Sequence, residues 1–490
     1  MVEINATTKE YLTLREAADL FEKSVHNISY LVQYRRIKKY YKIEEGEILK
    51  STKIKDKNIK KNATPVVSFN ELNSYFQKIK EREKKIIEKV PNCNKDLLFF
   101  DLSEKERTKH VHRLHPYLGK FIPQLVEYYL ERSFKKGDII LDPFMGSGTT
   151  LVEADTKNMR SIGIDVSKFN CMIAEAKMKK YDLKLLKREI TEILEKTKIL
   201  SSKKRVNGET YINDTKVLTN FIDKEYGEFS KEYETDNKFI NKWFARQTKK
   251  EMLIYKSLIP NYTYQNLLTV LLSRSIRSAR LTFHFQLTRL KEPIYEPYVC
   301  HKHKNKICVP TQSLLGFLKR YTNDTLRRIK EFSKIRSKKI YEIINADSRK
   351  VDLTEILSNK FKNEKIDGII TSPPYVGLIN YHKQHSYAYE LFGIEKNIEK
   401  EIGRKDLGKS QSAMQDYKIS IAEVFKNIKR FLKEDARVFI IANDKDDLYP
   451  EIAVLSGYKI IARDERPVTK KASRERAFYT ESIFHLIPLQ

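Results

Sequence analysis

Two short stretches of the chain contain residue types that could bind a small molecule and position a reacting group. The first is Asp142-Pro-Phe-Met-Gly-Ser-Gly-Thr-Thr150, in which Gly146 and Gly148 stand close together. Glycine lets a backbone approach a ligand closely and adopt positive φ angles. A helix that begins after such a turn also offers free N–H groups. This stretch therefore predicts a ligand-binding turn.

The residues of this turn exclude two common phosphate-binding patterns. A P-loop has a lysine after its last glycine, whereas Thr149 follows Gly148 here. The dinucleotide fingerprint has a third glycine, but Leu151 occupies that position. A turn that lacks both phosphate-binding patterns suits a ligand without phosphate groups. S-adenosylmethionine is such a ligand.

The second stretch is Thr371-Ser-Pro-Pro-Tyr375. Two consecutive prolines fix φ and remove two N–H donors, so their carbonyl groups stand rigidly. Ser372 Oγ and the Pro373 carbonyl could accept hydrogen bonds from an amino group and favour a pyramidal, nucleophilic nitrogen. Tyr375 could stack on the base that carries this amino group, which would have to be flipped out of a duplex. Methyl transfer would then depend chiefly on positioning. Taken alone, the stretch would rather indicate a polyproline-like loop or turn.

Both stretches need a parallel sheet to bring them together. Apolar runs alternate with helical segments before residue 181 and after residue 338, which predicts βαβ units. Strands are expected at residues 137–142, 160–165, 340–345, 366–371, 436–442, 458–463 and 482–488. Ligands bind at the carboxyl ends of such strands. Asp165 ends the second strand, where it could accept hydrogen bonds from ribose hydroxyls or serve only as a turn or helix-capping residue.

Together these motifs resemble the amino-methylating DNA methyltransferases, which modify cytosine N4 or adenine N6. The family's glycine motif reads D-P-F-x-G-S-G-T-T, and every fixed position is present at residues 142–150. His115-Pro-Tyr-Leu-Gly-Lys-Phe-Ile-Pro123 is similar to the family's upstream motif. The resemblance implies a doubly wound, mostly parallel seven-stranded α/β sheet. It covers a first part of the core at residues 100–185 and a second part at residues 339–490.

The resemblance also implies S-adenosylmethionine as the cofactor and assigns site residues. In the family, the upstream motif lies near the methionine moiety, and Lys120 could pair with the cofactor carboxylate. Asp347 stands where the family contacts the adenine amino group. The implied catalytic residues are Ser372, Pro373, Pro374 and Tyr375. The implied cofactor-binding residues are Tyr117, Lys120, Phe121, Asp142, Pro143, Phe144, Gly146, Ser147, Gly148, Thr149, Asp165 and Asp347.

The first residue of the catalytic motif favours cytosine N4 as the methylated position. Serine there is typical of the family's cytosine-N4 enzymes, whereas Asp or Asn is typical of its adenine-N6 enzymes, some of which carry serine. A hydroxyl can accept from either amino group, so adenine N6 remains an alternative. An RNA guanine-N2 methyltransferase is another, although such enzymes usually have Asp before Pro-Pro. An inactive DNA-binding regulator is disfavoured by the intact Gly146, Gly148, Pro373 and Tyr375.

Residues 1–90 predict a small DNA-binding domain and a charged connector helix. Thr13-Leu-Arg-Glu16 forms a capping box. One helix face is then expected to contain Leu14, Ala17, Ala18 and Phe21, and the next helix an inner face of Val25, Ile28, Leu31 and Val32. The pattern resembles an excisionase-like winged helix-turn-helix, whose second helix enters the major groove. That helix would present Asn27, Gln33, Arg35 and Arg36 to DNA. A helical hairpin used only for packing is the alternative.

Residues 186–338 predict a helical insert that serves as a target-recognition region, with Trp243, Arg274, Arg277 and Arg280 as its reading residues. A basic loop between the last two strands could hold phosphates or simply be solvated; its residues are Lys470, Lys471, Arg474 and Arg476. Cys300-His-Lys-His303 and Cys308 are potential zinc ligands. Their spacing is tighter and less regular than in ordinary structural zinc sites, which favours packing roles and no metal.

The composition fits a protein that binds a polyanion. The chain has 94 Lys and Arg against 65 Asp and Glu, a net charge of +29. Such an excess attracts nucleic acid through phosphate contacts and counterion release. Four cysteines exclude a disulfide framework, and no run approaches the ~18 apolar residues of a membrane span. We therefore expect a cytoplasmic enzyme that acts on double-stranded DNA, with a restriction endonuclease as a possible partner in a restriction-modification system.

Overall fold

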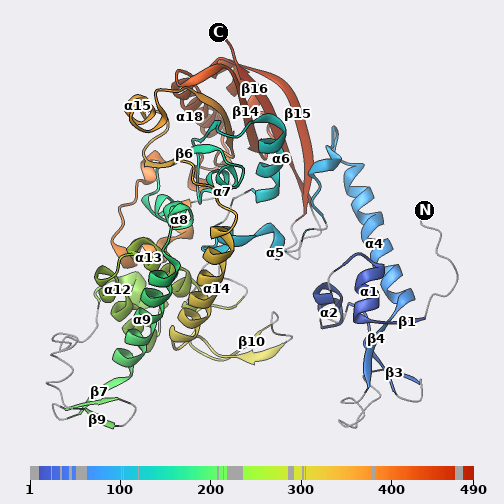
Figure 1. Ribbon diagram of the computed structural model, residues 1–490, viewed down its shortest axis with the longest axis vertical. Helices are drawn as coiled ribbons and strands as arrows, with labels where there is room; N and C mark the ends of the chain where they lie inside the picture. Colours follow the sequence, from blue (N-terminus) through green and yellow to red (C-terminus); the bar gives the residue numbers. More distant parts are fainter. Residues whose placement is uncertain are drawn as a thin grey trace. The chain divides into compact units, whose positions relative to one another are not determined.

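The computed structural model contains two compact units, which are described separately (Figure 1). Residues 1–93 and 469–478 form the first unit, and residues 94–468 and 479–490 form the second. The structure describes residues 10–23, 25–33, 36–43, 47–50, 63–100, 102, 104–117, 119, 121–206, 209–212, 215–217, 235–284, 292–300, 303, 305–377, 381–469 and 478–490.

A seven-stranded sheet forms the centre of the second unit, in the order β12-β6-β5-β13-β14-β16-β15. Its strands are β5 (Ile139–Asp142), β6 (Arg160–Asp165), β12 (Tyr341–Asn345), β13 (Ile366–Thr371), β14 (Leu432–Ala442), β15 (Tyr458–Thr469) and β16 (Phe478–Pro488). The pairs from β12 to β14 are parallel, and β16 is antiparallel to β14. The predicted mostly parallel α/β sheet is confirmed, with all seven strands near their expected positions.

Helices cover both faces of this sheet, because its central strands are apolar on both sides. Neighbouring residues alternate between two cores: Ile369 and Ile440 belong to one, Ile370 and Ile441 to the other. Such two-sided burial is typical of parallel strands. The helices that follow or precede the strands are α6 (Pro123–Ser133), α7 (Thr149–Thr156), α8 (Lys168–Met178), α15 (Thr354–Phe361), α18 (Gln411–Lys429) and α19 (Tyr449–Ser456).

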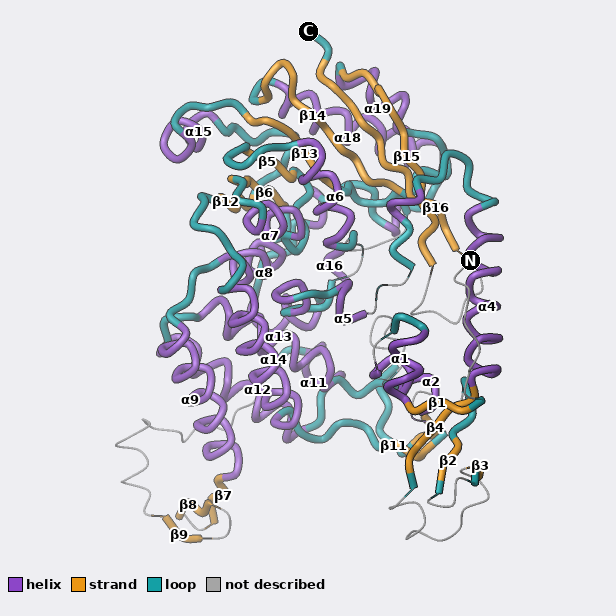
Figure 2. Tube along the Cα trace, turned by 45° about the vertical axis from the view of Figure 1, so that its right-hand side comes forward, coloured by secondary structure: helices purple, strands orange, loops and turns teal. Residues whose placement is uncertain are grey.

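The segment between the two parts of the core is mostly helical, and it packs on the core rather than standing apart. Its helices are α9 (Leu183–Ser202), α11 (Lys238–Trp243), α12 (Arg246–Leu258), α13 (Gln265–Ala279) and α14 (Leu315–Ser333). Figure 2 shows α9, α12, α13 and α14 gathered into one bundle. One hydrophobic cluster joins Leu186 and Leu268 of this segment to Phe169 of α8 and Tyr387 of α17 (Ser386–Phe392).

The described residues of the same segment also form two small antiparallel sheets. One pairs β7 (Lys203–Val206), β8 (Glu209–Ile212) and β9 (Thr215–Val217), and the other pairs β10 (Tyr298–Cys300) with β11 (Lys306–Cys308). The short helix α5 (Glu104–Arg107) precedes α6, and the short helix α16 (Tyr381–Gln384) follows β13. Among the described helices, none is both long enough and apolar enough to cross a membrane.

In its described residues, the first unit has a four-stranded antiparallel sheet and three helices. Its sheet has the order β1-β4-β2-β3. Its elements are β1 (Tyr11–Thr13), α1 (Leu14–Leu20), α2 (Val25–Gln33), β2 (Tyr40–Lys42), β3 (Ile48–Lys50), β4 (Thr64–Ser68) and α4 (Phe69–Ile87). The predicted capping box is confirmed, since Glu16 N–H donates to Thr13 Oγ1 and Thr13 N–H donates to Glu16 Oε2.

The two short helices of this unit pack through the faces that the sequence indicates, with one exception. Ala17 and Ala18 of α1 and Ile28 and Leu31 of α2 are buried in one core. The prediction that Val25 lies in this core is wrong. Val25 is the first residue of α2, and its side chain is 44% exposed. The contact with α1 therefore starts at Ile28.

Candidate active site

A cavity opens at the carboxyl ends of four adjacent parallel strands. Its walls include the turn after β5, Asp165 at the end of β6, Asp347 after β12 and Ser372 after β13. This is the edge of the sheet at which both sequence motifs were expected to meet.

The turn after β5 requires glycine at two positions. Gly146 has a φ of +51°, and a Cβ there would lie 3.0 Å from Tyr117 Oη. Gly148 has a φ of +76° and caps α7, and a Cβ there would lie 3.0 Å from Ala174 Cβ. Both the backbone conformation and the close neighbours therefore exclude larger residues.

Asp165 closes this turn and also lines the cavity. Its carboxylate accepts hydrogen bonds from Gly146 N at 2.9 Å, Ser167 N at 2.8 Å and Asn170 Nδ2 at 3.1 Å. Burial raises its pKa to about 6, although these hydrogen bonds act in the opposite direction. A carboxylate offers about four lone-pair sites. Asp165 thus stabilises the turn and the start of α8. Its carboxylate can still accept hydrogen bonds from a ligand in the cavity.

Asp142 connects the two sequence motifs. It is buried at the end of β5, and its Oδ1 accepts hydrogen bonds from Thr371 Oγ1 at 2.6 Å and Phe144 N at 3.1 Å. Thr371 is the last residue of β13, which pairs with β5. Burial raises the pKa of Asp142 to about 6. Asp142 therefore fixes the end of one strand to the end of the next and does not line the cavity.

Asp347 lies in the cavity wall beside a charge partner. Its Oδ2 accepts a hydrogen bond from Arg349 Nη2 at 2.7 Å. Burial alone would raise the pKa of Asp347, but the hydrogen bonds and charge of Arg349 outweigh it, so the pKa is lowered. The carboxylate is therefore ionised and positioned, and it can accept from a ligand amino group.

Neighbouring side chains hold the Ser-Pro-Pro-Tyr loop. Ser372 and Pro374 line the cavity, while Pro373 is buried. Tyr417 Oη donates to the Pro374 carbonyl at 2.9 Å. Tyr375 Oη lies 3.4 Å from Glu481 Oε1 and outside the cavity wall. The loop is thus tied to α18 on one side and to β16 on the other.

The structure brings most predicted cofactor residues to one cavity. Those in its wall are Tyr117, Phe121, Pro143, Phe144, Gly146, Ser147, Thr149, Asp165 and Asp347. Asp142 and Gly148 support the wall without lining it. Lys120 lies outside the described residues, as do Arg35, Lys470, Lys471, Arg474 and Arg476. Asn27 is half-buried, and Gln33 and Arg36 are exposed; their contact with DNA stays a prediction.

The cavity wall also contains His382, whose side chain contacts the buried Glu401, and the sequence motifs include neither residue. His382 Nδ1 lies 2.6 Å from Glu401 Oε2, and both side chains are buried. His382 Nε2 has no hydrogen-bond partner within the described part of the chain. His382 belongs to α16, whereas Glu401 lies in a loop without periodicity. Ser167, Asn170, Ile402 and Val424 also line the cavity.

Three of the four reading residues predicted in the helical segment have structural roles. Trp243, Arg274 and Arg280 are buried. Arg274 pairs with Asp324 at 2.7 Å, and the Arg280 guanidinium lies 4.9 Å from the centre of the Tyr387 ring. The prediction that these three side chains read DNA is wrong: all three are buried, and the two arginines have partners inside the fold.

Comparison with known proteins agrees with this arrangement. The sequence matches the family described as DNA methylase over residues 13–176. It is 43% identical to the Type II methyltransferase M.MjaII of Methanocaldococcus jannaschii, over 98% of this chain and 97% of that protein. It is also 27% identical to M.BsoBI of Geobacillus stearothermophilus, over 69% of this chain and 64% of that protein. M.MvaI of Kocuria varians is 27% identical over 59% of this chain and 58% of its own length.

The sheet order and the cavity at its carboxyl edge define an α/β methyltransferase fold. The nearly full-length match shows that the chain belongs to the family of amino-methylating DNA methyltransferases. Enzymes of this family take their methyl group from S-adenosylmethionine.

Proposed function

We propose that this chain methylates the exocyclic N4 amino group of cytosine at specific sites in double-stranded DNA. One observation carries the proposal. Ser372 lines the same cavity as the glycine turn, and the Thr371–Asp142 hydrogen bond ties the two loops together. A hydroxyl at this position is typical of the cytosine-N4 members of the family, and adenine N6 is the alternative.

The cavity fits S-adenosylmethionine in its chemistry. Asp165 and Asp347 offer carboxylate oxygens at adjacent strand ends for the hydroxyl and amino groups of an adenosine. Phe144 and Val424 form an apolar part of the wall, which suits the adenine ring. Gly146 places no side chain between the turn and Tyr117. Bound there, the cofactor supplies an electrophilic methyl group on a sulfonium centre.

The chain itself positions the amino group that receives this methyl. Ser372 Oγ and the Pro373 carbonyl accept hydrogen bonds from the –NH₂, which concentrates its lone pair toward the cofactor. Tyr417 holds the neighbouring Pro374 carbonyl, so the loop keeps its shape without the substrate. Tyr375 would stack on the flipped base after leaving its contact with Glu481.

The buried pair His382–Glu401 supplies a route for the proton that the amino group loses. A histidine that donates from Nδ1 to a carboxylate has a lone pair on Nε2. Nε2 of His382 is buried in the cavity wall without a partner in the described chain. In this proposal His382 accepts the proton after the new N–C bond has formed, and Glu401 stabilises the resulting cation.

DNA would be held by parts of the chain outside the cavity. We assign the target-recognition role to the segment 186–338 and a DNA-binding role to residues 1–90. The side chains proposed to contact DNA are Asn27, Gln33, Arg35, Arg36, Lys470, Lys471, Arg474 and Arg476. The relatives are Type II methyltransferases, which supports a role in a restriction-modification system and a cognate endonuclease as a partner.

Methyl incorporation from labelled S-adenosylmethionine tests this proposal. The wild type should label duplex DNA and not transfer RNA. Ser372→Ala should slow single-turnover transfer by about 10- to 100-fold while cofactor affinity stays unchanged, because the lost hydrogen bond forms to the reacting amino group. Full-rate transfer by this variant, or preferential labelling of transfer RNA, would overturn the proposal.

A further inference from the structure

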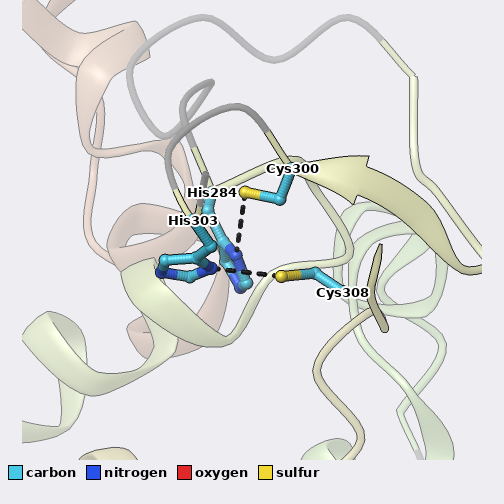
Figure 3. A group of neighbouring side chains, drawn as sticks. All are labelled: His284, Cys300, His303 and Cys308. Atoms are coloured by element: carbon cyan, nitrogen blue, oxygen red, sulfur yellow. Dashed lines mark hydrogen bonds between the residues drawn. The ribbon is translucent and has the colours of Figure 1, made fainter. Parts of the chain in front are cut away.

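Four potential metal ligands converge at one end of the helical segment (Figure 3). Cys300 and His303 come from the hairpin of β10 and β11, Cys308 ends that hairpin, and His284 follows α13. Cys300 Sγ lies 3.7 Å from His284 Nδ1, and His303 Nδ1 lies 3.1 Å from Cys308 Sγ. All four ligand atoms lie within 4.8 Å of one another.

We propose that these four residues form a structural zinc site of the Cys₂His₂ type. Zinc binds sulfur at about 2.3 Å and imidazole nitrogen at about 2.0–2.1 Å. In a tetrahedron of such bonds, ligand atoms stand about 3.3–3.8 Å apart. The two measured separations therefore lie close to what a shared ion requires. Two thiolates and two imidazoles in a closed set favour zinc over harder cations.

The charge around the cluster distinguishes it from a second group of potential ligands. His110, His112 and Glu153 also gather, but Lys109 Nζ lies 2.7 Å from Glu153 Oε2 and already neutralises that carboxylate. Cys300 and Cys308 supply two thiols, which lose their protons when they bind a metal. The Cys₂His₂ group is thus the better cation site of the two.

The hairpin is short, and one of its faces is exposed. β10 and β11 have three residues each and form a sheet of their own. Val299 and Ile307 face each other across the strands and are 54% and 75% exposed. Side chains alternate between faces, so the cysteines lie on the opposite face. Two-stranded hairpins are marginal in water, and metal binding supplies folding free energy.

The sequence identified three of these residues as potential zinc ligands but missed the fourth, His284, which is distant in the chain. Cys300, His303 and Cys308 have the spacing Cys-x₂-His-x₄-Cys, and His284 stands 16 residues before Cys300. His301, which was counted with the cluster, lies outside the described residues. A zinc ion here would tie the chain after α13 to the hairpin that precedes α14, independently of the base that is methylated.

Metal analysis of the full-length protein tests the site. Protein purified without chelators, or reconstituted with zinc, should contain about one zinc ion per chain by atomic emission. Cys308→Ser and His303→Gln should each abolish stoichiometric binding. Both side chains are at least partly exposed, so these variants should fold, which circular dichroism checks. Cys93→Ser, a change of a half-buried cysteine in the other unit, is the matched control and should keep its zinc.

Cobalt gives a readout that does not depend on the variants. Co²⁺ bound in place of zinc should give the tetrahedral absorption bands and the thiolate charge-transfer band of a two-sulfur site. The proposal is overturned if reconstituted wild type binds no zinc, or if Cys308→Ser and His303→Gln retain it. Loss of two titratable thiols without metal would overturn it too, since that would show a Cys300–Cys308 disulfide.

Discussion

Asp142 is buried at the end of β5, where it holds Thr371 and the backbone of Phe144. Burial disfavours the charged form of this side chain and raises its pKa to about 6. In the unfolded chain the pKa of an aspartate is about 3.9. The folded protein therefore retains this proton at a pH where the unfolded chain has released it, so stability falls as the pH rises through this window.

Replacement of Asp142 by Asn should remove this pH dependence and keep an acceptor oxygen for Thr371. Between pH 5 and pH 7.5, the free energy of unfolding of the wild type should fall by about 1 kcal/mol more than that of Asp142→Asn. Urea unfolding at the two pH values measures the difference. The charge of Asp142 contributes to the raised pKa of Asp165, so part of the difference between the two proteins comes through Asp165 and has the same sign. Parallel pH profiles would show that the carboxyl group of Asp142 titrates normally.

At the scale of elements, the turn between β5 and α7 depends on the bare backbone of Gly146. Gly146→Ala adds a Cβ at a φ of +51° and against Tyr117 Oη, so both stability and cofactor affinity should fall. Gly137→Ala is the matched control: its φ is +95° but nothing lies within 4 Å of the new Cβ. It should lose about 1–2 kcal/mol of stability with the cofactor affinity unchanged.

Calorimetric titration with S-adenosylmethionine and thermal unfolding separate the two effects of these variants. Equal cofactor affinity in Gly146→Ala and Gly137→Ala would contradict the account of the turn, because it would mean that only backbone strain matters there.

The strands were predictable because short apolar runs between polar turns rarely form any other secondary structure than a buried strand. Motif positions such as Gly146 and Ser372 then followed, since parallel strands end at one edge. Contacts between distant segments were not predictable. His382 meets Glu401 across a loop without periodicity, and His284 joins Cys300 only after α13 and β10 have packed. Burial of helical arginines such as Arg274 depends on a partner, Asp324, supplied by another helix.

At the scale of the whole molecule, the charge of +29 predicts DNA binding that weakens steeply with salt. Within the first unit, the exposed Arg36 is proposed to contact a phosphate or base. Arg36→Glu should weaken DNA binding at least several-fold and reduce the salt dependence by about one released ion. Cofactor affinity should stay the same.

Fluorescence anisotropy with labelled duplex DNA at several salt concentrations measures this effect. Lys78→Glu makes the same charge change at an exposed position of α4, in the same unit, and should weaken binding less. If both variants behave alike, the first unit attracts DNA only by its overall charge, and α2 has no defined place in a groove.

The methylated nucleoside itself reveals which atom receives the methyl group. Duplex DNA treated with the full-length enzyme and S-adenosylmethionine is digested to nucleosides, which are separated and identified by mass spectrometry. The hydroxyl of Ser372 beside the cofactor cavity predicts N4-methylcytosine. N6-methyladenine alone would contradict the choice of base and leave the reaction class intact, while the absence of both from DNA would contradict the account as a whole.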